Sequence, residues 1–217
     1  MKRLLLFIFI FLIGFSVAQA KTEEFGTWIE LTFTKKFLKD FEFSIIPELR
    51  LQDDFTIDEY IFEGKLGYDP FKFLGFAAAY RLNTNVKKNE DEISHSAVFD
   101  ATGKTDFKRF NASLRARFTN DYEASDTDAG DILLDSYYFR PRAKLTYNIK
   151  GKKVEPYVSY EVFHSFREKE YYKARFDVGF SRKINKMHEV GLYYRLNDYF
   201  SNRNSIHILG INYGFKF

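Results

Sequence analysis

Apolar and polar side chains alternate with a period of two along most of the chain. In residues 109–118, Phe110, Leu114 and Phe118 share one face with two alanines, while arginine, serine and asparagine occupy the other. Side chains of a β-strand point alternately to its two faces, so this segment predicts an amphipathic strand. The pattern recurs in residues 25–33, 41–51, 60–68, 74–82, 94–102, 137–147, 154–162, 172–180, 190–197 and 206–217. The sequence therefore predicts an all-β fold.

The connections between these segments are of two kinds. From the fourth segment on, short turns near residues 70, 105, 150 and 185 alternate with longer polar loops near residues 87, 125, 167 and 201. Outer-membrane barrels have short turns at one end and longer loops at the other, and strands of about ten residues suit a tilted membrane crossing. The chain is 19% aromatic, and Phe, Tyr and Leu dominate the apolar face. We predict a transmembrane antiparallel up-and-down β-barrel. A soluble, lipocalin-like periplasmic barrel has the same periodicity and remains an alternative.

The number of strands does not follow directly from the pattern. Eleven segments are found, whereas bacterial single-chain barrels use even numbers. We expect ten strands, with residues 25–34 not making a full crossing, or twelve if a long segment hides another. Pro47 predicts a bulge or local bend, because proline cannot donate to a ladder. Gly103-Lys104-Thr105 lacks the upstream glycine of a phosphate loop, so it predicts a turn.

The N-terminus has the features of an export signal. Lys2 and Arg3 precede an apolar run over residues 4–15, and Ala18 and Ala20 form a small-x-small cleavage pattern. We predict a signal peptide over residues 1–20, cleaved after Ala20, and a mature barrel over residues 21–217. Its loss lowers the formal charge from +3 to +1, which gives no argument for nucleic-acid binding. The chain has no cysteine, so thiolate chemistry and cysteine metal sites are excluded.

The C-terminal segment ends in the aromatic-x-Phe sequence Phe215-Lys216-Phe217, and resembles the closing strand of bacterial outer-membrane barrels. The resemblance implies recognition by the barrel-insertion machinery through the strand ending at Phe217, and outer-membrane lipid as a partner. Other short motifs are the early Trp28, Pro47-Glu48-Leu49-Arg50, Tyr80-Arg81, Pro156-Tyr157-Val158 and Tyr193-Tyr194-Arg195. With them, nearly the whole mature chain resembles an uncharacterised bacterial outer-membrane family, the domain of unknown function numbered 2490. That resemblance implies an outer-membrane barrel and brings no catalytic residues.

The most specific candidate site is a cluster of basic side chains on the inward faces of two neighbouring segments. Its members are Arg109, Arg115, Arg117, Arg140, Arg142 and Lys144. Like charges on adjacent strands repel, so acidic partners are expected. Glu155 and Glu161 on the next segment could supply them, as could Glu48 or Glu63 across the barrel. The cluster is consistent with a salt-bridged plug of a narrow barrel, and also with an anion site or a small anion-preferring passage.

One pair of residues could support hydrolysis of lipids. Ser205 and His207 share an outward strand face, and a Ser–His pair at a lipid-facing rim could act as nucleophile and base. Asn197 or Asn202 could orient the pair. His207 as an ordinary interfacial residue is the competing interpretation. The four histidines are scattered, so we predict no metal and no cofactor.

The function predicted from sequence is thus a porin-like monomer in the outer membrane, without enzymatic activity. Its role is structural, or the binding and limited passage of a small anionic solute. A phospholipase-like enzyme using Ser205 and His207 is the alternative, and the soluble binder comes third.

Overall fold

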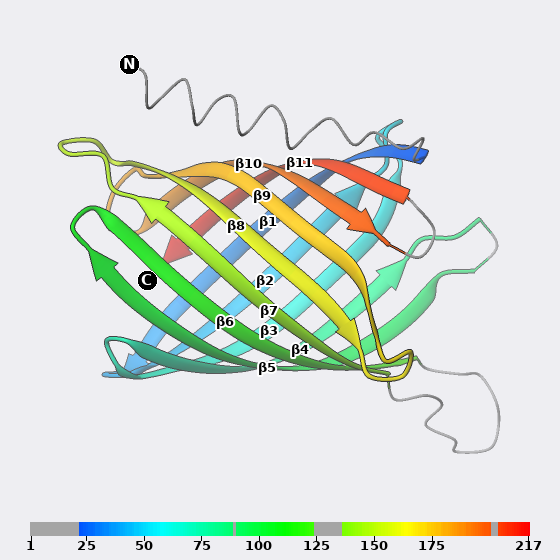
Figure 1. The fold of residues 1–217 in the computed structure, drawn as a ribbon, viewed down its shortest axis with the longest axis horizontal. Coiled ribbons are helices and arrows are strands. Elements are labelled where there is room, and N and C mark those ends of the chain that lie inside the picture. The colour runs from blue at the N-terminus through cyan, green and yellow to red at the C-terminus, as the bar shows by residue number, and fades with distance from the viewer. Residues whose placement is uncertain (1–21, 89, 124–135, 201–203) are drawn as a thin grey trace.

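The computed structural model describes residues 22–88, 90–123, 136–200 and 204–217, which form one closed β-barrel (Figure 1). The strands are β1 (Thr22–Leu38), β2 (Phe41–Leu51), β3 (Ile57–Phe71), β4 (Leu74–Asn85), β5 (Glu92–Phe107), β6 (Phe110–Glu123), β7 (Ser136–Tyr147), β8 (Val154–Ser165), β9 (Glu170–Lys183), β10 (His188–Tyr199) and β11 (Asn204–Lys216). The predicted signal peptide and the centre of the acidic loop near residue 125 lie outside the described residues. Within them, no helix is long and apolar enough to cross a membrane.

The barrel has eleven strands, which corrects the expected ten. Consecutive strands pair antiparallel, and the ring closes through a parallel pairing of β1 with β11, from Thr22↔Asn204 to Thr34↔Lys216. In a meander with an odd number of strands the first and last strands run in the same direction, so closure has to be parallel. Residues 25–34, which we expected to fall short of a full crossing, belong to a 17-residue strand. Alternation alone could not show that this segment completes the ring.

The connections alternate between the two ends of the barrel as predicted, but the predicted difference in length holds only in part, since the turn at residues 148–153 is longer than the loop at residues 166–169. The turn end of the barrel carries the connections at residues 39–40, 72–73, 108–109, 148–153 and 184–187. The loop end carries the connections at residues 52–56, 86–91, 124–135, 166–169 and 200–203. The predicted turn at Gly103–Thr105 is wrong, because β5 continues to Phe107 and the chain reverses at Lys108, whose φ of 56° is left-handed. The long β5 places this reversal farther along the chain than the sequence suggested.

Pro47 interrupts a ladder without shifting its register. The pairs Glu30↔Glu48 and Phe33↔Ile45 keep one register on both sides of Pro47, and no pair forms between them. Proline has no N–H to donate, which accounts for the gap. The predicted bulge at Pro47 is wrong, since the irregularity of β2 against β3 lies at Arg50/Leu51.

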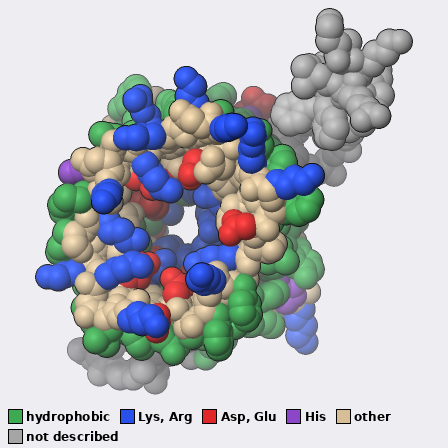
Figure 2. Space-filling view, turned by 90° about the vertical axis from the view of Figure 1, so that its left-hand side faces the viewer, with side chains coloured by type: hydrophobic (Ala, Val, Ile, Leu, Met, Phe, Trp, Pro, Cys, Tyr) green, Lys and Arg blue, Asp and Glu red, His purple; other side chains and the backbone are tan. Residues whose placement is uncertain are grey.

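The two faces of the sheet differ as the alternation predicted. Large apolar side chains point outward and are exposed, including Phe99, Leu114, Val158, Val178 and Ile211. The buried inward side chains are largely polar or charged, among them Glu63, Ser96, Asp100, Arg117, Ser159, Glu161, Asp177 and Asn197. Figure 2, which looks at the turn end, shows apolar side chains around the circumference and charged ones around a central opening. The core of this barrel is therefore polar and its outer surface apolar.

Tyr172 is an exception to the predicted faces. The register of β8 against β9 shifts between Phe163 and His164, so Phe163 pairs with Lys173 while His164 pairs with Tyr171. Tyr172 is the extra residue, and both it and Lys173 line the interior. The bulge turns inward a ring that strict alternation had placed outside.

The two ends of the barrel carry opposite charge. Exposed cations gather at the turn end: Lys36, Lys39, Lys72, Lys108, Arg109, Lys150, Lys152 and Lys186. Figure 2 shows Lys and Arg side chains spread around this rim. Exposed acids are prominent at the loop end: Glu23, Glu24, Asp53, Asp54 and Asp58. The barrel is thus electrically polar along its axis.

Candidate functional site

The interior contains three cavities in series. A middle cavity of about 450 Å³ shares Trp28, Arg50, Lys173 and Arg175 with a cavity of about 370 Å³ at the loop end. It shares Glu30 and Thr32 with one of about 390 Å³ at the turn end. Shared walls join the three into one axial space, and the opening in Figure 2 is consistent with that continuity.

Cations outnumber acids around the middle cavity. Its ten basic lining residues are Arg50, Lys65, Arg81, Arg115, Arg117, Arg140, Arg142, Lys173, Arg175 and Arg195. Its six acidic lining residues are Glu30, Glu48, Glu59, Glu63, Asp121 and Glu161. Asp100 and Asp177, which pair with Arg117 and Arg195, raise the acids to eight. An excess of two positive charges remains in a confined space.

Most of the charged groups form pairs between adjacent strands. Arg117 donates through Nε and Nη2 to the two carboxylate oxygens of Asp100, both at 2.7 Å. Arg195 contacts Asp177 in the same two-pronged way at 2.7 and 3.0 Å, and Ser159 Oγ also donates to Asp177 at 3.1 Å. Asp100 and Asp177 lie directly opposite their arginines in the strand register. Both acids are held in place by cross-strand neighbours.

Two further pairs follow the same rule on β2, β3 and β4. Arg81 on β4 contacts Glu63 on β3 through Nε at 2.9 Å and Nη2 at 2.5 Å. Arg50 on β2 donates to Glu59, which lies directly opposite it on β3. It also donates to Glu48 at 2.6 Å. Opposite charges at facing positions thus stabilise the sheet from within.

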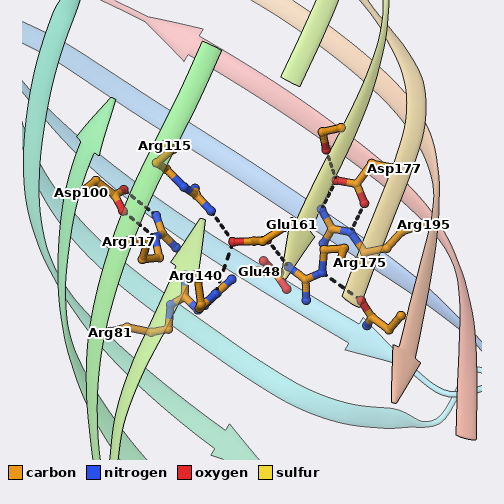
Figure 3. A network of polar contacts seen from close by, with 12 residues as sticks. Glu48, Arg81, Asp100, Arg115, Arg117, Arg140, Glu161, Arg175, Asp177 and Arg195 are labelled. Carbon is orange, nitrogen blue, oxygen red and sulfur yellow. Dashed lines mark hydrogen bonds and ion pairs between the residues drawn. The ribbon is translucent and has the colours of Figure 1, made fainter. Parts of the chain in front are cut away.

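Glu161 is at the centre of a different arrangement, in which one carboxylate is shared by three arginines (Figure 3). Arg115 Nη2 donates to Glu161 Oε1 at 2.6 Å, while Arg140 Nε lies at 3.3 Å and Arg175 Nη1 at 3.6 Å. The arginines come from β6, β7 and β9, and Glu161 on β8 is 1% exposed. Several positive charges therefore converge on a single buried acid.

Aromatic rings hold cations without neutralising them. The Arg50 guanidinium lies 3.8 Å from the centroid of the Trp28 ring, and Arg195 lies at 4.9 Å. Lys173 Nζ lies 4.1 Å and Arg140 4.3 Å from the ring of Phe163. Cation–π contacts orient these groups, and of the four only Lys173 forms no ion pair with a described acid.

Some cationic groups of the cavity lack an acidic partner. Arg142 and Lys173 form no ion pair with any residue in the described part of the chain. The Nε atoms of Arg115 and Arg140 are buried and have no hydrogen-bond acceptor among the described residues. The middle cavity therefore retains unused donors for an anion.

The structure places most of the predicted basic cluster inside the barrel. Arg115, Arg117, Arg140 and Arg142 line the middle cavity. Lys144 lies nearer the turn end, with Nζ 4.0 Å from the Tyr157 ring centroid. These positions agree with the inward faces predicted for the two strands.

Two members of the predicted site are elsewhere. Arg109 is a correction, because it lies exposed in the turn between β5 and β6 rather than in the interior. Glu155 is another, because it lies at the turn end of β8 and contacts Lys183 at 3.5 Å instead of the cluster. Both residues lie near strand ends. The alternation of side chains shows which face a residue is on, but not where it lies along the barrel axis.

Sequence reasoning missed Arg175 and Arg195, although both were placed on inward faces. On β7, Arg140, Arg142 and Lys144 follow one another at alternate positions, whereas Asp177 follows Arg175 on β9 and Arg195 is preceded by Tyr193 on β10. Arg175 lies directly opposite Glu161 in the register, and Arg195 directly opposite Asp177. A search for opposite charges at facing strand positions could have found both.

Ser205 and His207 each contact a different partner. Ser205 Oγ donates to Asp198 at 3.1 Å, whereas Nδ1 of His207 is 2.6 Å from the Tyr194 hydroxyl and its ring stacks on Phe25. Asn197 points into the lumen, where its side chain accepts from Arg175 Nε at 2.9 Å, so it does not orient this pair. Asn202 lies outside the described residues. The histidine is anchored as an aromatic residue of the outer rim.

No group of three or more potential metal ligands occurs in the part of the chain that the structure describes.

Fold and site together define a closed β-barrel with an apolar exterior and an arginine-rich polar interior. A comparison with protein families finds that residues 25–207 match a family described as a protein of unknown function (DUF2490), and the chain belongs to that family. A search of the curated proteins finds no match.

Proposed function

We propose that this protein is an outer-membrane barrel whose interior binds small anionic solutes and gives them limited passage. The observation that carries the proposal is the middle cavity of the lumen, around which ten cations face eight acids. Two of these ten cations, Arg142 and Lys173, form no ion pair with an acid of the described residues. A confined excess of one charge sign raises the local concentration of the opposite ion.

The apolar outer surface supports a membrane location. Phe99, Val178 and Ile211 lie in the middle of their strands and are 49%, 42% and 45% exposed. A contiguous apolar band of this kind is stable in lipid and is a liability in water. A lipocalin-like soluble binder would carry its apolar side chains inside, which is the reverse arrangement.

The size of the lumen restricts what could pass. The middle cavity of about 450 Å³ is crossed by long arginine and aromatic side chains. Small barrels fill most of their interior with side chains, so large solutes are excluded. The proposal is therefore confined to small anions, and it involves no enzymatic step.

Reversal potentials in planar bilayers test this proposal. The refolded barrel is expected to conduct chloride in preference to potassium across a KCl gradient. The double variant Arg142→Gln/Lys173→Gln should lose much of that preference, because it removes two cations of the middle cavity that form no ion pair with a described acid. The variant Lys88→Gln/Lys169→Gln is the control, since it removes equal charge from exposed loop-end positions.

Cation preference, or absence of conductance in a correctly folded barrel, would contradict the proposal. Turnover of phospholipid that is lost in both Ser205→Ala and His207→Ala would replace it with the lipid-hydrolase alternative.

A further inference from the structure

Glu161 differs from every other lumenal acid in how it is held. Asp100 and Asp177 each meet one arginine through two short hydrogen bonds. Glu161 meets three arginines, and only the contact with Arg115, at 2.6 Å, is a short hydrogen bond. The other two ion pairs are 3.3 and 3.6 Å long. One carboxylate is thus shared among three guanidinium groups, two of which lie beyond short hydrogen-bond distance.

Arg142 shows most clearly that cationic groups outnumber acids around Glu161. It lies directly opposite Glu161 in the pairing of β7 with β8, and also directly opposite Arg115 in the pairing of β6 with β7. Despite this position it forms no ion pair with Glu161 or with any other described acid. The buried Nε of Arg115 has no hydrogen-bond acceptor in the described structure, and that of Arg140 makes no hydrogen bond although it lies 3.3 Å from Glu161 Oε1. Buried donors of this kind are costly unless an acceptor reaches them.

All of these groups border one space. Arg115, Arg140, Arg142, Glu161 and Arg175 line the same middle cavity of about 450 Å³. Figure 3 shows the arginines converging on Glu161 from both sides. A solute that enters the cavity therefore reaches these donors and the carboxylate together.

We infer that this cluster is an anion-binding site. The Glu161 carboxylate occupies the site in the absence of solute, and a small carboxylate or phosphate solute displaces it. The ligand class follows from the donors, because planar guanidinium groups match oxyanions with paired oxygens. The inference rests on the proposed function, for which it names the site and the class of solute. In the absence of solute Glu161 keeps the arginines together, and a solute with more oxygens reaches donors that Glu161 leaves unused.

The chain contains a natural reporter of this site. Trp28 is its single tryptophan, it lines the middle cavity, and its ring lies 5.4 Å from the Arg175 guanidinium. Binding of acetate or phosphate should change its fluorescence in a saturable way at constant ionic strength. Because Glu161 competes with the solute, Glu161→Gln is expected to bind roughly five- to tenfold more tightly than the wild type, a usual range for coupling between sites.

Two further variants keep the test decisive. Arg140→Gln should weaken binding about fivefold or more, and this holds even if Glu161→Gln fails to fold. Glu155→Gln is the matched control, since it makes the same change at an acid that lies at the turn end and contacts Lys183 instead of the cluster, and it should leave the affinity unchanged. Equal affinities in the wild type and Glu161→Gln, or in the wild type and Arg140→Gln, would overturn the inference.

The outcome separates this inference from the proposed function. A saturable fluorescence change with no anion preference in bilayers would support the anion-binding site and contradict anion passage through the barrel. Anion preference without a specific effect of acetate or phosphate would keep passage and reject the site.

Discussion

At the scale of single residues, this barrel is stabilised by charges that face each other across neighbouring strands. Asp100 and Arg117 are 5% and 7% exposed, and they contact each other through two hydrogen bonds. Removal of one partner from such a pair leaves an uncompensated buried charge, which is far more costly than loss of an exposed pair.

The first prediction concerns this pair. Asp100→Asn should lower the free energy of unfolding by about 3–5 kcal/mol, because Arg117 loses its counter-charge in a buried position. The double variant Asp100→Asn/Arg117→Gln should recover part of that loss. Urea unfolding of the barrel in lipid vesicles measures both. Additive destabilisation in the double variant would mean that the two charges do not stabilise each other.

At the scale of the strands, the outward face of β5 allows a comparison of depth within one strand. Phe99 lies near its centre and Phe107 at its turn end, and they are 49% and 65% exposed. Phe99→Arg should destabilise the barrel in lipid by about 2–4 kcal/mol, whereas Phe107→Arg should cost at most about 1 kcal/mol. The reason is that, in the proposed membrane location, the central position would face hydrocarbon and the terminal one would face headgroups. Equal effects at the two positions would argue against a membrane location.

The parallel seam between β1 and β11 gives a prediction about closure. Ile29 pairs with Ile211 in this seam, and the chain has no native cysteine. Ile29→Cys/Ile211→Cys should form a disulfide on mild oxidation, because facing residues on paired strands lie within disulfide reach. Non-reducing gels of the cleaved or unfolded protein would show it. The control Ile29→Cys/Phe215→Cys keeps the same face but moves one thiol four residues along the strand, so it should remain reduced. The opposite pattern would contradict eleven-strand closure.

The strand faces could be predicted from sequence, and the way the ring closes could not. The period of two placed residues such as Phe99 outside and Arg117 inside. If the two faces of a strand were exchanged, charged side chains would face lipid in the predicted membrane barrel. Nothing in that period shows whether β1 pairs with β11 or ends early. The bulge that turns Tyr172 inward was also hidden, because it depends on the register of β8 against β9.

The candidate site could be predicted in part for a related reason. Arg115, Arg140 and Glu161 were found because their strands are consecutive in sequence. The contribution of Arg175 was missed because only the register of β9 against β8 places it opposite Glu161. The partner of Glu155 was missed because depth along the axis depends on strand tilt, which alternation does not report.

At the scale of the whole molecule, the barrel is polar along its axis. The turn end carries exposed Lys36, Lys39, Lys72, Lys150 and Lys186, among other cations, and the loop end carries exposed acids. Such a charge gradient concentrates anions at one mouth and depletes them at the other.

This polarity predicts asymmetric conduction. With barrels inserted in one orientation, anion current should be larger when anions enter from the turn end. Lys150→Gln/Lys152→Gln/Lys186→Gln should reduce the asymmetry, and high salt should reduce it in the wild type through screening. Current–voltage curves measure the effect. Symmetric curves at low salt would show that the rim charges do not act on the permeating ions.

The central claim is that the apolar outer face of a closed barrel lies in the outer membrane. Fractionation of cell envelopes, combined with gel migration of boiled and unboiled samples, tests it most directly. We predict that the protein sediments with the outer membrane and that the unboiled form migrates as a compact species, because the closed strand ring resists detergent. Recovery as a soluble periplasmic protein, with no shift on boiling, would contradict the account.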